Sequence, residues 1–198
     1  MALKKENRYY NASPDKCYRH LDIPVEFRPP SFDTGNRDLN KFNEIIFSID
    51  ELDKNFTDWF RSIGLEIALC RFFTNPPYTK YSVHVDRILP EENLEVVLNF
   101  PFDDEGSIIS WFNLKEGTEP YIMISPNGVK IVTFNKQDCV PICSTKMKKP
   151  TLLNVGYIHT LETGPTYRKC YSFFFKKIAD NTNLEWDDAM TIFGPYIS

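Results

Sequence analysis

The sequence lacks the features that place a protein in or across a membrane. No apolar run approaches the roughly eighteen residues that a membrane-spanning helix requires, and residues 1–17 contain no apolar core of a secretion signal. The five cysteines are an odd number, and without a secretion signal they indicate free thiols in a reducing compartment. We therefore expect a cytoplasmic protein without a membrane segment.

Glycine and net positive charge are also scarce. Only 8 of the 198 residues are glycine, which argues against a disordered or low-complexity chain. The 23 lysine and arginine residues are outnumbered by 27 acidic residues, so the formal net charge is −4. Proteins that bind nucleic acid usually present a basic surface, so the composition argues against a nucleic-acid partner. The oligomeric state leaves no mark on the sequence.

Aromatic residues and proline are abundant, with 16 Phe, 10 Tyr and 14 Pro, and this composition favours strands and turns. Asn127-Gly128 is a strong hairpin signal, and Cys139 and Cys143 flank a proline-containing segment that we interpret as a loop. Nine segments have the alternation or composition of short strands: residues 66–73, 81–88, 94–102, 107–113, 120–124, 129–134, 151–155, 158–161 and 167–176. A series of short strands of this number predicts a sandwich or a barrel.

The remaining segments complete a single domain spanning residues 1–198. Residues 1–35 are polar and proline-rich, so we expect an irregular lead-in with a short strand near residues 25–27. Apolar residues recur every three or four positions across 36–64 and predict one or two amphipathic helices that stop at Gly64. The sheet region is 65–176, and 177–198 is a loosely helical tail that packs back on the body. The fold class is therefore mainly β, or α+β, with a helical layer in front of a closed double sheet.

One segment of this sheet region carries candidate metal ligands. YSVHVDRIL, residues 81–89, places His84 and Asp86 two positions apart in a strand-like run. Side chains alternate faces along a strand, so both project to the same side, with Cα atoms roughly 6 to 7 Å apart. An imidazole and a carboxylate suit a first-row divalent metal, and a second histidine would complete a two-histidine, one-carboxylate site for Fe(II).

The chain offers only two other histidines for that position, His20 and His159. His20 lies in the proline-rich lead-in, whereas His159 begins a strand of the sheet region, so His159 is favoured. Arg168 follows after a turn at residues 162–165, and a hairpin of that length returns the arginine beside the histidine. The planar guanidinium of an arginine can bind a carboxylate through two parallel hydrogen bonds.

His84-x-Asp86, followed by His159 and Arg168, resembles the motif of the Fe(II)/2-oxoglutarate-dependent dioxygenases. The stretch NLEVVLNFPFDDEGSIISWFNL, residues 93–114, is similar to the segment that follows the first motif in small phage-type members of that superfamily. Tyr81-x-x-His84-x-Asp86 is also similar to the motif of the prolyl hydroxylases. The similarity covers roughly residues 65–176, and the flanks match no family that we can name.

This resemblance implies a double-stranded β-helix, the jelly-roll or cupin-like fold, with supporting N-terminal helices. It implies that His84, Asp86 and His159 bind Fe(II), and that Arg168 pairs with the C5-carboxylate of 2-oxoglutarate. O2 is then the oxidant, ascorbate serves as reductant, and succinate and CO2 are released as a protein side chain or a small molecule is hydroxylated. Because Asp86 fills the place that chloride takes in the iron halogenases, hydroxylation is favoured over halogenation.

Several positions depart from that pattern or have a simpler explanation. Cys170 stands where some members place a serine that contacts the carboxylate, and a thiol is a poorer donor. Tyr81 and Asn99 are further candidate cosubstrate-binding residues, although the spacing of Tyr81 from His84 places it on the opposite strand face unless a bulge intervenes. Trp111 and Asn99 could line the pocket, although Trp111 is more typical of a core residue and Asn99 of one that satisfies backbone at a strand edge. Arg71 could also reach the pocket, although an exposed strand arginine is the commoner case.

Two other functions remain open. The same fold can serve as a binding or structural protein whose His-x-Asp pair is vestigial. A cupin-type enzyme with another metal also fits the histidines, but it leaves Arg168 without a cosubstrate carboxylate to bind. The loops and flanks that set specificity match no known segment, so the sequence does not specify the substrate.

Overall fold

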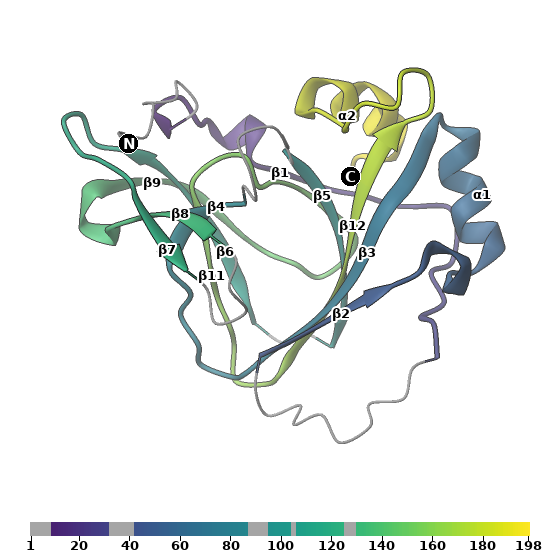
Figure 1. Cartoon of the computed structure of the whole chain (residues 1–198), viewed down its shortest axis with the longest axis horizontal. Coiled ribbons are helices and arrows are strands. Elements are labelled where there is room, and N and C mark those ends of the chain that lie inside the picture. Colours follow the sequence, from purple (N-terminus) through teal and green to yellow (C-terminus); the bar gives the residue numbers. More distant parts are fainter. Residues whose placement is uncertain (1–8, 32–41, 87–94, 104–105, 125–129) are drawn as a thin grey trace.

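The computed structural model describes residues 9–31, 42–86, 95–103, 106–124 and 130–198, and these form two six-stranded antiparallel sheets (Figure 1). The main sheet has the order β1 (Tyr18–His20), β10 (Thr151–Asn154), β5 (Val96–Asp103), β12 (Arg168–Lys177), β3 (Leu65–Asn75) and β2 (Asn43–Phe47). The second sheet has the order β7 (Tyr121–Ile124), β8 (Lys130–Phe134), β4 (Val83–Val85), β11 (His159–Glu162), β6 (Ile108–Leu114) and β9 (Cys139–Lys146).

The connection between the sheets defines the fold. Eight strands alternate so that β3, β5, β10 and β12 lie in the main sheet while β4, β6, β9 and β11 lie in the second. The chain therefore winds back and forth between two facing sheets, which is the double-stranded β-helix, or jelly roll. This topology confirms the predicted fold class, and each of the nine segments predicted to be strands contains one.

The helical prediction for residues 36–64 is wrong in its first half, because residues Asn43–Phe47 form strand β2. Ile45 and Phe47 pack into the core while Glu44 and Ile46 lie on the other face, so the segment follows the two-residue alternation of a strand. The long strand β3 offers its edge to this segment along five residues. That pairing partner overrides a local spacing that also fits a helix.

Two further segments differ from their predictions. The segment around Pro141, expected to be a loop, is the edge strand β9, and the register of its pairing with β6 shifts at that proline. Proline has no N–H to donate, and an irregularity on an edge strand is where a sheet tolerates it. Residues 25–27 are not a strand, and the lead-in instead contributes β1, which pairs with β10. Asn127-Gly128 lies outside the described residues.

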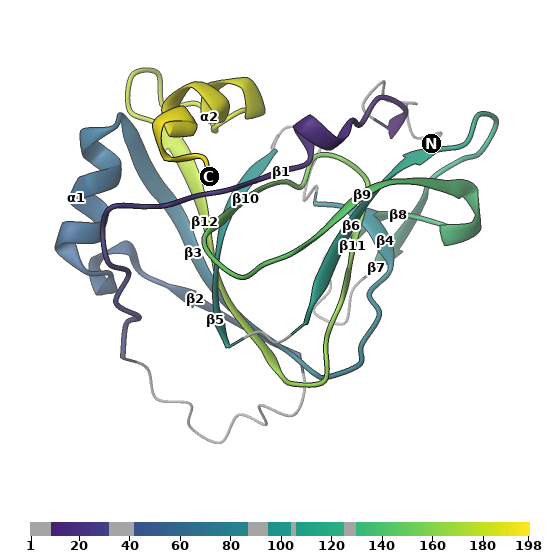
Figure 2. The same ribbon diagram turned by 180° about the vertical axis from the view of Figure 1, so that it is seen from behind.

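Two helices cover the outer face of the main sheet, α1 (Lys54–Ser62) and α2 (Trp186–Phe193) (Figures 1 and 2). The aromatic rings of Phe56, Phe60 and Phe193 pack there against strand residues such as Phe173. Neither helix has the length and apolar character needed to cross a membrane. Short 3-10 helices complete the described structure: η2 (Pro14–Lys16), η3 (Ile49–Glu51), η4 (Lys136–Asp138) and η5 (Gly194–Tyr196).

A separate apolar cluster fills the space between the sheets. Val97, Cys170 and Phe174 from the main sheet meet Ile109 and Trp111 from the second. Polar side chains of the two sheets face each other across the same interior space.

Candidate metal centre

Strands β4 and β11 bring the two predicted histidine ligands together. His84 and His159 are direct cross-strand neighbours, and their ring centroids are 4.6 Å apart. Val83 and Val85, on either side of His84, are buried in a cluster on the outer face of the second sheet, so His84 projects inward. Asp86 follows β4 directly, and its backbone N–H donates to the carbonyl of Val155 at 3.1 Å.

The three side chains converge on one point. The distance from Asp86 Oδ1 to Nε2 is 3.1 Å for His84 and 3.8 Å for His159. All three ligand atoms lie within 4.8 Å of one another, and among the described residues this is the one group of histidine, cysteine and acidic side chains so arranged. Metal–ligand bonds of about 2.0 to 2.2 Å place two ligands of one ion about 3 to 3.5 Å apart. The 3.1 Å pair already has this spacing, and the other ligand atoms reach it by small side-chain movements toward an ion.

Backbone carbonyls orient both imidazole rings. His84 Nδ1 lies 2.8 Å from the carbonyl oxygen of Ser82, and His159 Nδ1 lies 2.9 Å from that of Tyr157. A carbonyl oxygen can only accept, so each Nδ1 carries the proton and each Nε2 faces the centre. This second contact fixes the tautomer and the ring orientation that a metal-binding histidine requires.

Burial and mutual interactions shift the pKa values of these three side chains in different directions. Burial opposes ionisation of Asp86, but the hydrogen bond from His84 and the positive field around it outweigh that effect and lower the pKa of Asp86 to about 2. Burial and repulsion from His84 lower the pKa of His159 to about 4. Burial also disfavours the charged form of His84, yet the hydrogen bond to Asp86 overcomes it and raises the pKa of His84.

A second polar cluster surrounds Arg168, which is only 4% exposed. Arg168 Nη1 donates to Asn75 Oδ1 at 2.8 Å, and Asn75 Nδ2 donates to the hydroxyl of Tyr81 at 2.8 Å. Tyr81 precedes β4 rather than lying in it, so strand alternation from His84 does not determine its direction, and the expectation of an opposite face does not hold. Asn75 gave no signal in the sequence; it faces Arg168 because the two are paired in register between β3 and β12.

Asn99 and Trp111 lie deeper between the sheets. Asn99 accepts a hydrogen bond from Ser172 Oγ, and its amide lies 3.7 Å from the sulfur of Met147. These contacts link Asn99 to β12 and to the core rather than to Arg168. Trp111 is fully buried, and its indole N–H donates to the carbonyl of Asn154 at 2.9 Å, as a core tryptophan does.

Arg71 is not the exposed strand residue that the sequence suggested. Its side chain is 19% exposed and forms an ion pair with Glu44 at 3.3 Å. The guanidinium carbon lies 5.4 Å from the centre of the Phe174 ring, in the cluster between the sheets. The alternation of β3 places Arg71 and Asn75 on the same inward face.

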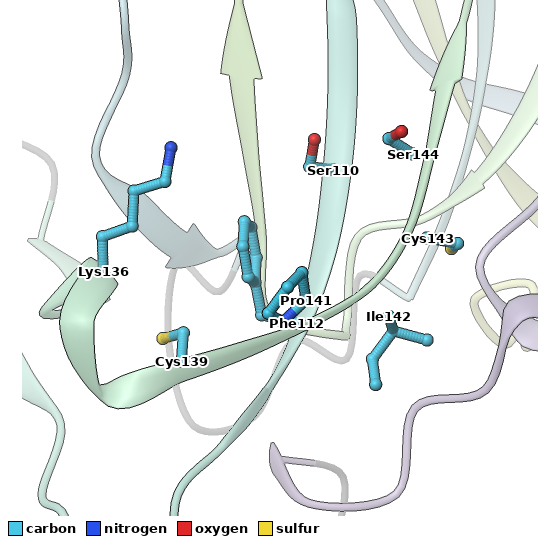
Figure 3. Close-up of a pocket in the computed structure, with 8 residues that line it drawn as sticks. All are labelled: Ser110, Phe112, Lys136, Cys139, Pro141, Ile142, Cys143 and Ser144. Carbon is cyan, nitrogen blue, oxygen red and sulfur yellow. The ribbon is translucent and has the colours of Figure 1, made fainter.

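An open pocket of about 460 Å³ lies elsewhere on the second sheet (Figure 3). It is lined by residues of β6 and β9 together with Lys136, and it shares no residue with the metal group. Its polar side chains are two hydroxyls, a lysine and the thiols of Cys139 and Cys143, and the described residues form no group of three metal ligands there. Chemistry therefore centres on the histidines rather than on this pocket.

Comparisons with known proteins give only distant structural likenesses. No family model matches the chain, and no curated protein is similar to it in sequence. A prolyl-4-hydroxylase from Pseudomonas putida is 13% identical with a TM-score of 0.41, over 77% of this chain and 78% of that one. A 2OG-Fe(II) oxygenase family oxidoreductase from Burkholderia pseudomallei is 12% identical with a TM-score of 0.35, over 67% and 57% of the two chains. AviO1 from Streptomyces viridochromogenes Tue57 is 12% identical with a TM-score of 0.36, over 83% and 74%.

The chain thus spans a little over half the length of the Burkholderia protein. At such TM-scores a likeness carries no function, so the site is interpreted from its own geometry. The chain is a jelly-roll protein whose second sheet and the residue after β4 bring two histidines and an aspartate into a group with the composition and spacing of a metal site.

Proposed function

We propose that this protein is an Fe(II)- and 2-oxoglutarate-dependent oxygenase that hydroxylates a protein side chain or a small molecule. The observation that carries the proposal is the placement of His84, Asp86 and His159 within one metal's reach on a jelly roll. Two imidazoles and one carboxylate leave open positions on a first-row divalent metal, which suits ferrous iron. When bound, iron with 2-oxoglutarate and O2 supplies the oxidising chemistry.

The protein's own residues bind and orient in this proposal. His84 and His159 direct their Nε2 atoms at the centre, because backbone carbonyls hold each Nδ1, and Asp86 remains ionised at all physiological pH values. Arg168 is the candidate anchor for the distal carboxylate of 2-oxoglutarate. It is buried and held by Asn75, so little of its conformational freedom remains to be lost on binding.

Burial of Arg168 strengthens its interaction with a bound carboxylate. A charge-assisted hydrogen bond is worth more in a water-poor interior than at the surface, and Arg168 is almost fully withdrawn from solvent. Tyr81 is hydrogen-bonded to Asn75, which is also the partner of Arg168, so the Tyr81 hydroxyl belongs to the same polar cluster. The resemblance to the prolyl hydroxylase motif around Tyr81 favours a protein side chain over a small molecule as substrate.

The test is succinate formation from 2-oxoglutarate with Fe(II) and ascorbate, alongside Mn(II) and 2-oxoglutarate binding titrations. We expect iron-dependent succinate that falls to background in His84→Ala, and at least a tenfold loss of Mn(II) affinity in that variant. Arg168→Met should weaken 2-oxoglutarate binding by about 10- to 100-fold, the value of a hydrogen bond to a charged group.

His20→Ala is the matched control, because His20 contacts Thr151 and Thr145 and lies outside the metal group. It should keep wild-type metal and 2-oxoglutarate binding. If wild-type protein binds Mn(II) but not 2-oxoglutarate, the oxygenase proposal is wrong and a cupin-type metal protein is favoured. If the wild-type protein binds neither Mn(II) nor 2-oxoglutarate, the remaining candidate function is that of a non-catalytic binding protein.

A further inference from the structure

Two arginines lie on the inward face of the main sheet. Arg168 begins β12 and pairs in register with Asn75, and Arg71 lies four residues before Asn75 on β3. Four strand residues span about 13 Å, so the two arginine positions are separated along the sheet by the length of a small ligand. The proposed oxygenase uses only Arg168, and Arg71 has no role in it.

The environment of Arg71 is that of a binding group rather than of a surface charge. Its guanidinium lies over the Phe174 ring, and its Nε is buried without a hydrogen-bond partner among the described residues. Its ion-pair partner Glu44 is 21% exposed and lies on the edge strand β2. A buried guanidinium N–H is costly to leave unsatisfied, which points to a further acceptor at this position.

Arg71 also faces the interior between the two sheets. Its guanidinium lies over Phe174, which belongs to the cluster where the main sheet meets Ile109 and Trp111 of the second sheet. Trp111 is the cross-strand neighbour of His159, so the space that Arg71 faces is bounded by the sheet that carries the two histidines.

We propose that Arg71 recognises an oxyanion, a carboxylate or a phosphate, on the substrate that is oxidised, with Glu44 as its counter-ion when no substrate is bound. This inference rests on the proposed oxygenase function and assigns the chemical class of its unidentified substrate. The planar fork of an arginine matches both anions.

The two arginines differ in solvent exposure, as expected if each binds a different ligand. Arg168 is enclosed, as suits a cosubstrate held at the base of the site, whereas Arg71 keeps a fifth of its side chain accessible to an arriving molecule. Glu44 is partly exposed on an edge strand, so an incoming anion can take its place by forming the same charge-assisted pair with Arg71. Phe174 holds the guanidinium plane in place meanwhile.

The test measures anion binding to protein that is first shown to bind Mn(II) and saturating 2-oxoglutarate. Acetate and methyl phosphate are the probes, and the relaxation of their methyl protons by the bound Mn(II) reports binding near the metal. A response to acetate identifies a carboxylate class, and a response to methyl phosphate identifies a phosphate class. Failure of the first step counts against the oxygenase itself, so the two failures are distinguished.

Arg71→Met should weaken binding of the responding probe by about 10- to 100-fold while 2-oxoglutarate affinity stays unchanged. Glu44→Gln should tighten probe binding several-fold, because it neutralises the competing anion; a purely structural ion pair predicts no gain. Equal probe binding in wild type and Arg71→Met would show that the anion binds the metal directly, and would overturn the inference. So would a wild type that binds neither probe.

If Arg71→Met loses Mn(II) and 2-oxoglutarate binding through misfolding, Glu44→Gln decides. Tighter probe binding in that variant supports the inference, and unchanged or weaker binding overturns it.

Discussion

At the scale of single residues, the two histidines of the metal group have opposite pKa shifts although their rings face each other. His159 is buried and repelled by a charged His84, so its pKa falls to about 4. His84 has the closer contact with Asp86, at 3.1 Å, and its pKa is raised despite burial. On acidification His84 therefore takes up a proton before His159 does.

This asymmetry predicts the pH dependence of metal binding. A metal binds only neutral imidazole, and the pKa of His84 in the folded protein lies above the ordinary histidine value of 6.5. Affinity should be complete above the pKa of His84 and fall by up to tenfold per pH unit below it, so the loss begins above pH 6.5. Asp86 and His159, with pKa values of about 2 and 4, do not limit binding in this window. Mn(II) titrations between pH 5.5 and about 8.5 measure this, and a flat profile above pH 6.5 would contradict it.

Asn75 is the residue on which the Arg168 cluster depends. Its amide oxygen accepts from Arg168 and its amide nitrogen donates to Tyr81, so Asn75→Leu removes both hydrogen bonds and leaves a buried charge less satisfied. We expect a loss of about 1.5 to 3 kcal/mol in the free energy of unfolding, with weaker 2-oxoglutarate binding. Tyr81→Phe removes only one of the two contacts and should cost about 1 kcal/mol. Urea unfolding measures both, and an equal cost would show that Arg168 does not depend on Asn75.

At the scale of elements, helix α1 begins at a capping side chain. The N–H groups of its first turn have no backbone acceptor within the helix, and this side chain accepts a hydrogen bond from one of them. Asp53 is the N-cap, and its carboxylate accepts from the N–H of Phe56 at 3.2 Å. The helix then buries Phe56 and Phe60 against the outer face of the main sheet, so its start fixes how those rings pack.

Asp53→Ala should lower the free energy of unfolding by about 1 kcal/mol, the usual value of an N-cap. Asp58→Ala is the control on the same helix, because Asp58 is exposed and only pairs with Lys54 and Arg61 on the surface. We expect no measurable change for the control in thermal or denaturant unfolding. A similar loss in both variants would mean that helix charge, and not the cap, is responsible.

At the scale of the whole molecule, the metal group connects parts of the chain that are distant in sequence. His84 and His159 come from neighbouring strands of the second sheet, and the backbone of Asp86 is tied to Val155 beyond β10. A ligand that binds these groups in the folded state alone must stabilise the fold by mass action.

Mn(II) at a hundredfold excess over its dissociation constant should therefore add about 2.7 kcal/mol to the stability. For a chain of this length that corresponds to a rise of about 5 to 10 °C in Tm. The shift should vanish in His84→Ala and persist in His20→Ala, as followed by thermal unfolding. A shift of equal size in His84→Ala would mean that the ion binds elsewhere.

The sequence determined the parts of this protein that depend on neighbours along the chain. Alternation of residues identified nine strand segments, and their number predicted a sandwich or a barrel. The jelly roll was implied by the family resemblance of His84-x-Asp86, His159 and Arg168. The two-residue spacing of His84 and Asp86, with so few other histidines available, selected the candidate ligands. Strand periodicity is a local property, so these features could be read from the sequence.

The tertiary structure alone decided the features that depend on pairing. Residues 43–47 form a strand because the edge of β3 is available to them, and Pro141 is tolerated because β9 is an edge strand with a shifted register. Asn75 meets Arg168, and Arg71 meets Glu44 and Phe174, across strands that are separated by many residues. No local pattern reports which distant strands become neighbours, since that choice is made by burial of the whole core.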